Sequence, residues 1–275
     1  MTFKAACIQS TATPDLQHDI RALAAMIRDA AGMGAGFIAT PEYCAGLETR
    51  EGKMFPVAFA ETEHPALPAF QALARELRIS LLIGSIGIKA PDGRIFNRSF
   101  MLDQNGNIAA RYDKIHLFDI DLGEGKAYRE SATIAAGEQG VIAPCTEGFI
   151  GLSICYDIRF PHLYRAYAKA GALMLAAPAA FTKVTGEAHW HVLQRARAIE
   201  NGAYVISPGQ CGTLAGGAEC YGHSLIVDPW GRVLADGGDR PGIVMAEIDL
   251  SLAADTRRRI PSLTHDRPYL GPAHV

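Results

Sequence analysis

The sequence predicts an α/β protein with two mixed sheets stacked in a four-layer α-β-β-α sandwich. Short apolar runs typical of strands recur from one end of the chain to the other, and helical periodicity appears between some of them. Glycine-containing turns separate several pairs of runs, which indicates antiparallel hairpins, whereas strand–helix–strand segments indicate parallel neighbours. Since a doubly wound sheet has few hairpins, stacked sheets with helices outside fit this mixture better.

The expected strands are short runs of apolar residues. In chain order they lie at 4–8, 37–40, 80–88, 96–102, 108–111, 149–154, 172–177, 203–207, 223–227 and 243–248. Three turns each divide two strand-like runs, and these are PDGR at 91–94, QNGN at 104–107 and PWGR at 229–232. The run LMLAA is apolar throughout, as expected of a strand that is buried on both faces.

Helical periodicity occurs at 16–31, 65–77, 162–170 and 187–200. Pro161 directly precedes the third of these segments, where a first-turn proline is tolerated. Neither a linker nor a shift in composition divides the chain, so residues 1–275 are expected to form a single domain. The final stretch, 257–275, is rich in Pro, Arg and His. We expect it to be an extended tail at a subunit interface of a homodimer or higher homo-oligomer.

Length and composition argue against several classes of protein. Of the 275 residues, 49% are hydrophobic and 20% are charged, so a soluble domain with a large core is expected. The net charge of −3, without a basic block, argues against a nucleic-acid partner. The N-terminus lacks a signal-peptide pattern, and the longest apolar run, 171–181, is too short to cross a bilayer. We therefore expect a cytoplasmic protein without a membrane partner.

Six cysteines are scattered along the chain, at positions 7, 44, 145, 155, 211 and 220. They form no CxxC pair and have no zinc-ligand spacing with histidine, so neither a metal site nor a cofactor is expected. Most of them should be free, buried thiols. Cys155 differs, because the apolar run 149–154 stops there and polar residues follow at once. A thiol at the end of a strand is accessible at a sheet edge, as a covalent nucleophile must be.

Two further strand ends bear the groups that a cysteine hydrolase requires. The run 37–40 leads into Glu42, and the run 108–111 leads into Lys114. Because parallel strands of stacked sheets end on the same edge, these residues and Cys155 are expected to converge. Glu42 would then take the thiol proton and return it to the leaving amine. Lys114 and the backbone N–H of Tyr156 would stabilise the negative charge that develops on the substrate.

Motifs around these residues resemble those of a known family. PEYC around Glu42, RYDKIHLF around Lys114 and GLSICYDIRFP around Cys155 resemble the nitrilase superfamily of carbon–nitrogen hydrolases, in order and in separation. The resemblance continues through YGHSLIVDPWGRVLA and covers essentially the whole chain. It implies an α-β-β-α sandwich, a Glu-Lys-Cys triad at these three positions and an assembly into dimers.

The resemblance also implies a fourth site residue. Many members have a second glutamate between the lysine and the cysteine, and Glu130 matches that place. It would position the substrate and orient Lys114. One departure is His162 in RFPH, where many relatives have glutamate. It lies beyond the nucleophile and should leave the triad intact, but the contact that the glutamate normally makes is in doubt.

The finer motifs resemble small stand-alone amidases. KIHLFDID, GQCG and YGHS are similar to omega-amidases and lean toward deaminated-glutathione amidases. Their substrates bear carboxylates, so Arg159, four residues beyond the nucleophile, is the expected anchor unless it forms a structural ion pair with Asp157 or a neighbouring acid. Weaker candidates for this role are Lys183 and Arg129, which are expected on loops. Candidates for the pocket wall are Phe181, His189 and Trp190. For Trp190 the alternative is packing within its helix.

The sequence thus predicts a cysteine-dependent amidase that hydrolyses a small carboxylated amide through a thioester and releases ammonia or an amine. A nitrilase or an N-carbamoyl amide hydrolase would use the same triad. A redox-active thiol protein would need a resolving cysteine, and the chain has no CxxC. A silent scaffold would have lost a triad member. A Cys-His protease would need an oriented histidine, and we expect His116 to be no more than an outer neighbour of the site.

Overall fold

The computed structural model describes residues 2–50, 53–121, 123 and 127–271. Its first sheet contains β1 (Thr2–Gln9), β2 (Ala35–Ala39), β5 (Ala58–Phe59), β6 (Ser80–Lys89), β7 (Ile95–Leu102), β8 (Ile108–Asp113), β11 (Ile134–Ala135) and β20 (Gly242–Asp249). The order is β11-β7-β6-β2-β1-β20, with β8 paired to β7 and β5 paired to β6. The neighbours β1, β2 and β6 are parallel, whereas β20, β7 and β8 pair in antiparallel fashion.

The second sheet is also mixed. In spatial order it contains β12 (Val141–Cys145), β13 (Gly148–Leu152), β14 (Met174–Ala176), β15 (Tyr204–Ser207), β18 (Leu225–Val227) and β19 (Val233–Asp236). The strands β13, β14 and β15 are parallel, and the remaining pairs are antiparallel. The three predicted turns connect β6 to β7, β7 to β8 and β18 to β19, and each of these pairs is antiparallel.

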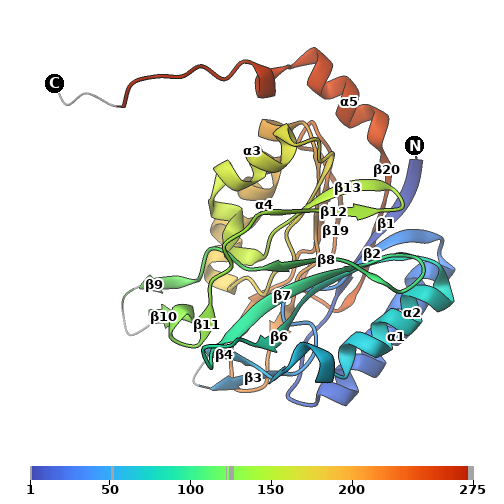
Figure 1. The fold of residues 1–275 in the computed structure, drawn as a ribbon, viewed down its shortest axis with the longest axis vertical. Coiled ribbons are helices and arrows are strands. Elements are labelled where there is room, and N and C mark those ends of the chain that lie inside the picture. Colours follow the sequence, from blue (N-terminus) through green and yellow to red (C-terminus); the bar gives the residue numbers. More distant parts are fainter. Residues whose placement is uncertain (1, 51–52, 122, 124–126, 272–275) are drawn as a thin grey trace.

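Two helices cover the outer face of each sheet (Figure 1). They are α1 (Leu16–Gly32) and α2 (Ala66–Leu77) on the first sheet, and α3 (Pro161–Lys169) and α4 (Lys183–Asn201) on the second. In β1, Ala6 and Ile8 belong to the cluster beneath α1 and α2, while Ala5 and Cys7 belong to the cluster shared with the second sheet. This alternation is what a strand covered on both faces requires. Among the described helices, none is both long and apolar enough to span a lipid bilayer.

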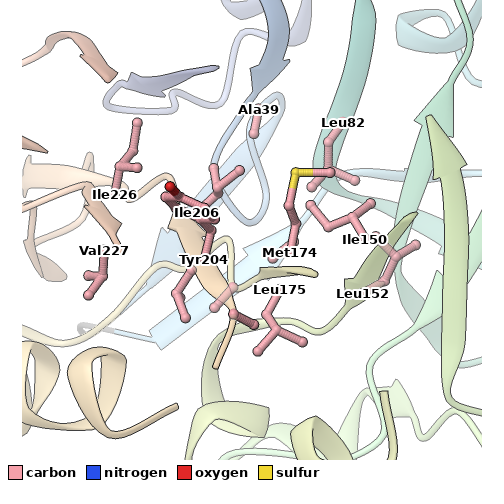
Figure 2. Close-up of a cluster of buried hydrophobic side chains, with 14 of the residues drawn as sticks. Ala39, Leu82, Ile150, Leu152, Met174, Leu175, Tyr204, Ile206, Ile226 and Val227 are labelled. Atoms are coloured by element: carbon pink, nitrogen blue, oxygen red, sulfur yellow. The ribbon is translucent and has the colours of Figure 1, made fainter. Parts of the chain in front are cut away.

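The two sheets share one buried core. Figure 2 shows Ala39 and Leu82 of the first sheet beside Met174 and Ile206 of the second, and all four are fully buried. Burying a side chain of the size of Leu, Ile or Met contributes roughly 1.5–3 kcal/mol relative to its exposure in water. The predicted α-β-β-α sandwich with two mixed sheets is therefore confirmed, and its central layer holds the sheets in register with each other.

Several short elements were not predicted. Three hairpins pair β3 (Leu47–Arg50) with β4 (Lys53–Pro56), β9 (Asp119–Asp121) with β10 (Ala127–Arg129), and β16 (Cys211–Thr213) with β17 (Glu219–Tyr221). Single turns of 3₁₀ helix occur at Glu61–Glu63 (η1), Glu130–Ala132 (η2) and Cys155–Arg159 (η3). The hairpins are short and rich in polar residues, so no apolar run marks them in the sequence.

The prediction of an extended tail at 257–275 is wrong for its first residues. Helix α5 (Leu250–Arg259) continues to Arg259, and Ser262–Thr264 (η4) forms a further turn. Asp249 caps α5 by accepting the Ser251 N–H at 3.0 Å. Arg257 donates to the Ala172 carbonyl at 2.6 Å and so ties the helix to the body of the protein. Beyond η4 the described chain is extended and leads away from the body (Figure 1).

Candidate active site

Cys155 stands at a sharp turn just beyond the second sheet. Strand β13 ends at Leu152, earlier than the predicted run, and Cys155 opens η3. Its φ is 49°, in the left-handed region that residues with a side chain seldom adopt. Its N–H donates to the Pro178 carbonyl at 2.9 Å. Backbone held in such a conformation concentrates at functional sites, and the side chain here is 7% exposed.

The buried carboxylate of Asp157 fixes this turn. It accepts the Ile154 N–H at 2.8 Å and the Tyr112 hydroxyl at 2.6 Å. It also accepts the His116 N–H at 3.0 Å and lies 2.6 Å from His116 Nδ1. Asp157 thus joins β8 and the segment after it to the nucleophile turn. Its partner is His116 rather than Arg159, so the ion pair considered from the sequence does not form, and His116 is an outer neighbour of the site.

Glu42 follows β2 and is almost completely buried. One carboxylate oxygen, Oε2, accepts the Ala180 N–H at 2.7 Å. The other, Oε1, accepts from the Asn97 amide at 2.8 Å and from Lys114 Nζ at 2.9 Å. Gln210 donates to the carbonyl oxygens of Glu42 and Tyr43 at 3.1 and 3.0 Å. The side chain and the loop that bears it are therefore held in one position.

Lys114 directly follows β8, and its ammonium group lies between two carboxylates. Nζ is 2.9 Å from Glu42 Oε1 and 2.9 Å from Glu130 Oε2. Burial works to lower the pKa of Lys114, but Glu130 and Glu42 outweigh burial and raise the pKa well above its usual value. Lys114 is therefore a fixed positive charge across the range of pH in which proteins function.

Glu130 opens η2 and completes the polar cluster. Besides Lys114, it accepts the Tyr43 hydroxyl at 3.1 Å and the Phe118 N–H at 2.6 Å. These bonds connect the β9–β10 region to the loop of Glu42. Glu130 thus lies at the place that its predicted role requires, in direct contact with Lys114.

The thiol of Cys155 is held in its neutral form. Burial and the neighbouring Glu42 carboxylate raise the pKa of Cys155 well above its usual value, and Lys114 opposes this shift only in part. Glu42 and the sulfur line the same cavity. A thiol in this environment needs a base to accept its proton at the moment of attack, and Glu42 is placed to do so.

These groups line one cavity of about 270 Å³. Glu42, Lys114, Glu130 and Cys155 form its polar wall. Phe118, Tyr128, Phe181 and the β4 residues Met54 and Phe55 contribute apolar surface. A largely apolar pocket with a few converging polar groups is typical of a small-molecule site.

The residues predicted to bind substrate are placed unequally. Phe181 lines the cavity, and the exposed Arg129 and Lys53 do so as well. Arg159 is not among the described residues that line the cavity. Its guanidinium carbon lies 5.5 Å from the centre of the Phe181 ring, and Nη2 contacts His189 Nδ1 at 3.3 Å. Tyr156 follows Cys155 in η3, and its ring packs edge-on against Phe118 at 5.2 Å.

Two of those predictions do not fit the structure. Lys183 is on the surface, where it pairs with Glu219 at 3.5 Å. Trp190 is fully buried behind Phe181, with ring centres 4.9 Å apart, and its Nε1 donates to the His223 carbonyl at 2.8 Å. Trp190 therefore packs α4 onto the sheet, which agrees with the alternative prediction that this residue serves in helix packing. Neither residue is among the described residues that line the cavity.

Sequence reasoning missed several groups that hold the site together. Asn97 is fully buried in β7 and orients Glu42, although an asparagine inside the apolar run FNRSFML was a visible clue. Tyr43 and the N–H groups of Phe118 and Ala180 hold the two glutamates. Backbone donors have no side-chain signature, so the sequence does not reveal them. His162 is exposed at the start of α3 and packs edge-on against Phe160 and His116.

Comparison with known proteins agrees with this fold and geometry. Residues 4–258 match the model of the carbon-nitrogen hydrolase family, so the chain belongs to that family. It is accordingly a hydrolase that acts on carbon–nitrogen bonds other than peptide bonds, and the resemblance to the nitrilase superfamily is confirmed.

Individual relatives cover nearly the whole chain. The deaminated glutathione amidase of Synechocystis sp. (strain PCC 6803 / GT-S) is 39% identical over 269 residues, which are 96% of this chain and 97% of that protein. Saccharomyces cerevisiae Nit3, a member of branch 10 of the nitrilase superfamily, has a TM-score of 0.84 at 28% identity and covers 94% of each chain. A glutamate-to-glutamine mutant of the amidase from Nesterenkonia sp. AN1 bears acrylamide added to its active-site cysteine. Its TM-score is 0.75 at 26% identity, over 94% of this chain and 98% of that one.

Proposed function

We propose that this protein is a cysteine-dependent amidase for a small carboxylated amide, either deaminated glutathione or the omega-amide of a dicarboxylic acid. The observation that supports this most is the meeting of Glu42, Lys114 and Glu130 around Cys155 in one cavity. At about 270 Å³ the cavity suits a small amide rather than a folded protein. The name of the Synechocystis relative supports the choice of substrate class.

In the first half of the reaction, the Cys155 sulfur attacks the amide carbon while Glu42 takes the thiol proton. A carbon–sulfur bond forms, and the electron pair of the carbonyl moves to oxygen. When this intermediate collapses, the carbon–nitrogen bond breaks, and Glu42 returns its proton to the leaving nitrogen. Ammonia or an amine departs, and a thioester on Cys155 remains.

The second half repeats these steps with water. Glu42 takes a proton from water as the water oxygen attacks the thioester carbon. The carbon–sulfur bond then breaks, the sulfur regains the proton from Glu42, and the carboxylic acid product leaves. The reaction consumes one water molecule and needs no cofactor, because the same base serves in both directions of proton transfer.

Lys114 and the Tyr156 N–H stabilise the oxyanion that forms in each half. The ammonium group is fixed by Glu42 and Glu130 before substrate arrives, so little reorganisation accompanies the reaction. The loss of one such donor typically lowers the rate by roughly 10²–10³. Glu130 acts as a positioning residue, because its contacts with Lys114, Tyr43 and Phe118 hold the ammonium in place.

Arg159 is our candidate for the carboxylate of the substrate. Its guanidinium carbon lies 5.5 Å from the centre of the Phe181 ring, and Phe181 lines the cavity, so we infer that movement of these two side chains would bring the guanidinium to a bound substrate. Lys53 and Arg129 line the same cavity and increase the positive charge around a carboxylated substrate. A guanidinium binds a carboxylate with two parallel hydrogen bonds, which fixes orientation as well as charge.

A parallel assay of four substrate classes tests this proposal. Product release is measured with deaminated glutathione, a dicarboxylic monoamide, a matched nitrile and an N-carbamoyl amine, for the wild type and for Cys155→Ala. We expect the two carboxylated amides to be turned over fastest and the variant to be inactive. Preference for the nitrile or the carbamoyl compound would contradict the amide assignment. Stoichiometric thiol oxidation without product would instead indicate a redox thiol protein.

We propose further that the protein works as a homodimer or higher homo-oligomer in the cytoplasm. All six cysteines are free, as expected in a reducing compartment. The apolar side chains of Tyr269 and Leu270 in the extended tail are 89% and 94% exposed. A second subunit would bury them.

A further inference from the structure

A second cluster of titratable side chains lies apart from the residues of the amidase mechanism. This His-His-Asp cluster consists of His191 on α4, His223 just before β18 and Asp236 at the end of β19. Nε2 of His191 lies 3.0 Å from Asp236 Oδ2, and Nδ1 of His223 lies 2.8 Å from Asp236 Oδ1. One ligand atom from each residue lies within 4.8 Å of the other two.

Contacts around His223 fix its orientation. Its φ is 49°, which a non-glycine residue adopts only when its surroundings hold it there. Its N–H donates to the Gly238 carbonyl at 2.6 Å, and its own carbonyl accepts from Trp190 Nε1 at 2.8 Å. The Tyr221 ring stacks on the imidazole with centres 4.4 Å apart. These contacts hold the backbone and the imidazole of His223 in one position before any ion arrives.

Asp236 is held equally well and stays accessible. Its Oδ1 accepts the Gly238 N–H at 2.9 Å in addition to its contact with His223. The side chains of His191, His223 and Asp236 are 34%, 27% and 34% exposed, so an ion can enter from solvent and water can complete its coordination.

We propose that His191 Nε2, His223 Nδ1 and one carboxylate oxygen of Asp236 bind a divalent transition metal of the zinc class. Imidazole nitrogens favour such ions over calcium and magnesium, which prefer oxygen ligands. With metal–ligand distances of about 2.0–2.2 Å, neighbouring ligands of a tetrahedral ion lie roughly 3.4 Å apart. His191 and His223 contact different oxygens of Asp236, but the three ligand atoms already lie within 4.8 Å of one another, so modest side-chain movement would bring them to this spacing.

The ion would connect three segments of the chain. It would link α4 to the end of β19 and to the residues just before β18. Because only the folded chain assembles these ligands, binding would raise the stability of the fold. We therefore assign the ion a role in stability rather than in amide hydrolysis. If the metal site does not exist, the proposed amidase function is unaffected.

Titration of the chelator-treated full-length protein with ZnCl₂ by isothermal calorimetry tests the site. We expect saturable binding of one ion per chain. His191→Ala and Asp236→Asn should each weaken binding by at least about tenfold, since the loss even of an outer partner of a metal ligand costs that much. The control is His18→Ala, which removes an exposed histidine on α1 and should bind like the wild type. An absence of saturable binding by the wild type, or unchanged binding by both cluster variants, would overturn the proposal.

The cysteines compete for zinc, so a spectroscopic measurement accompanies the titration. We expect Co²⁺ bound to the wild type to show visible bands without the ultraviolet band of a thiolate–cobalt bond. A thiolate band would place the metal on a cysteine and contradict the site. The Co²⁺ spectrum distinguishes the two sites even if a cluster variant fails to fold, because it is recorded on the wild type alone. For variants that fold, circular dichroism in the absence of metal should match the wild type.

Discussion

The thiol of Cys155 and the carboxylate of Glu42 form the reacting pair, and each depends on the other. Because burial and Glu42 raise the pKa of Cys155, the nucleophile rests as a thiol rather than as a thiolate. Lys114 is too closely engaged with the two glutamates to reverse this. Attack and proton transfer are therefore coupled, and the reaction requires the carboxylate as a base.

Glu42→Gln tests this coupling. We expect kcat for amide hydrolysis to fall by roughly 10²–10⁴, the usual contribution of a general base. The loss of the carboxylate charge removes one cause of the raised pKa of Cys155, so the thiol should still be modified by an electrophile such as acrylamide. Ammonia release and intact-protein mass spectrometry measure the two reactions. A variant that forms the thioester at the normal rate would show that Glu42 is not the base.

Arg159→Ala tests the carboxylate anchor. A hydrogen bond to a charged group contributes about 1.5–3 kcal/mol, so KM for a carboxylated amide should rise roughly 10- to 100-fold. KM for a neutral amide of the same length should change little. Arg28→Ala is a matched control, because it removes an exposed arginine whose partner is Glu76 on α2. Equal effects on the charged and neutral amides would eliminate Arg159 as the anchor.

The sequence predicted the site residues that follow strands, but it did not predict which residues of helices and loops line the cavity. Glu42, Lys114 and Cys155 come directly after apolar runs, and the structure brings them together. Trp190 was misplaced because periodicity finds a helix but does not say which side meets a cavity. Lys183 was expected on a loop, but α4 begins at this residue, four positions before the predicted helix. The Ala180 N–H that holds Glu42 comes from a loop and a backbone group, for which no residue pattern exists.

At the scale of elements, helix termini are held by specific side chains as well as by packing. His64 lies just before α2, and its Nδ1 accepts the Ala66 N–H at 3.2 Å. Its Nε2 has no hydrogen-bonding partner in the described part of the chain. Burial lowers the pKa of His64 from 6.5 to about 4, so the folded protein keeps this histidine neutral.

His64→Asn tests the consequence for stability. A lowered folded-state pKa gives stability that is present above pH 6.5 and is lost as pH falls toward 4, up to about 3 kcal/mol in the wild type. Asparagine can still accept at the helix N-terminus but does not titrate. Urea unfolding at several pH values should therefore show a shallower acid dependence in the variant. An identical dependence in both proteins would mean that His64 is not the titrating group.

Long apolar strands and amphipathic helices were predictable, because each has a period that matches its fold. The paired strands β6 and β7 are examples, with the PDGR turn between them. The β3–β4 and β9–β10 hairpins were not predictable, because their sequences are short and polar and contain no apolar run. Arg257 similarly ties the end of α5 to the body of the protein through a hydrogen bond to the Ala172 carbonyl, a contact that the composition of the tail does not reveal.

At the scale of the whole molecule, the two sheets bring distant parts of the chain to one cavity. Strands β2 and β8 belong to the first sheet and β13 to the second, and the buried layer between them sets the distance between their ends. The layer order was predictable from hairpins mixed with strand–helix–strand segments. The way in which side chains meet across the layer was not, because it depends on packing between residues far apart in sequence.

A truncation after Asp266 tests the proposed role of the tail, because it removes Tyr269 and Leu270 and keeps the contacts of Asp266. Within the part of the tail that the structure describes, Asp266 is the last residue with a side-chain ion pair, and its partners are Arg165 and Lys169 of α3. Beyond it, the apolar residues Tyr269 and Leu270 are exposed. We expect the truncated protein to keep its circular dichroism spectrum but to form a smaller assembly by light scattering. An unchanged molar mass would separate the tail from assembly.

The most direct test of the proposed mechanism is to trap the covalent thioester intermediate on Cys155. Wild-type protein is mixed with a carboxylated amide, quenched in acid within a turnover, digested and mapped by mass spectrometry. We expect an acyl group on the peptide that contains Cys155, and neither adduct nor product with Cys155→Ala. An acyl group on another residue, or product release by Cys155→Ala at the wild-type rate, would contradict the assignment of Cys155 as the nucleophile.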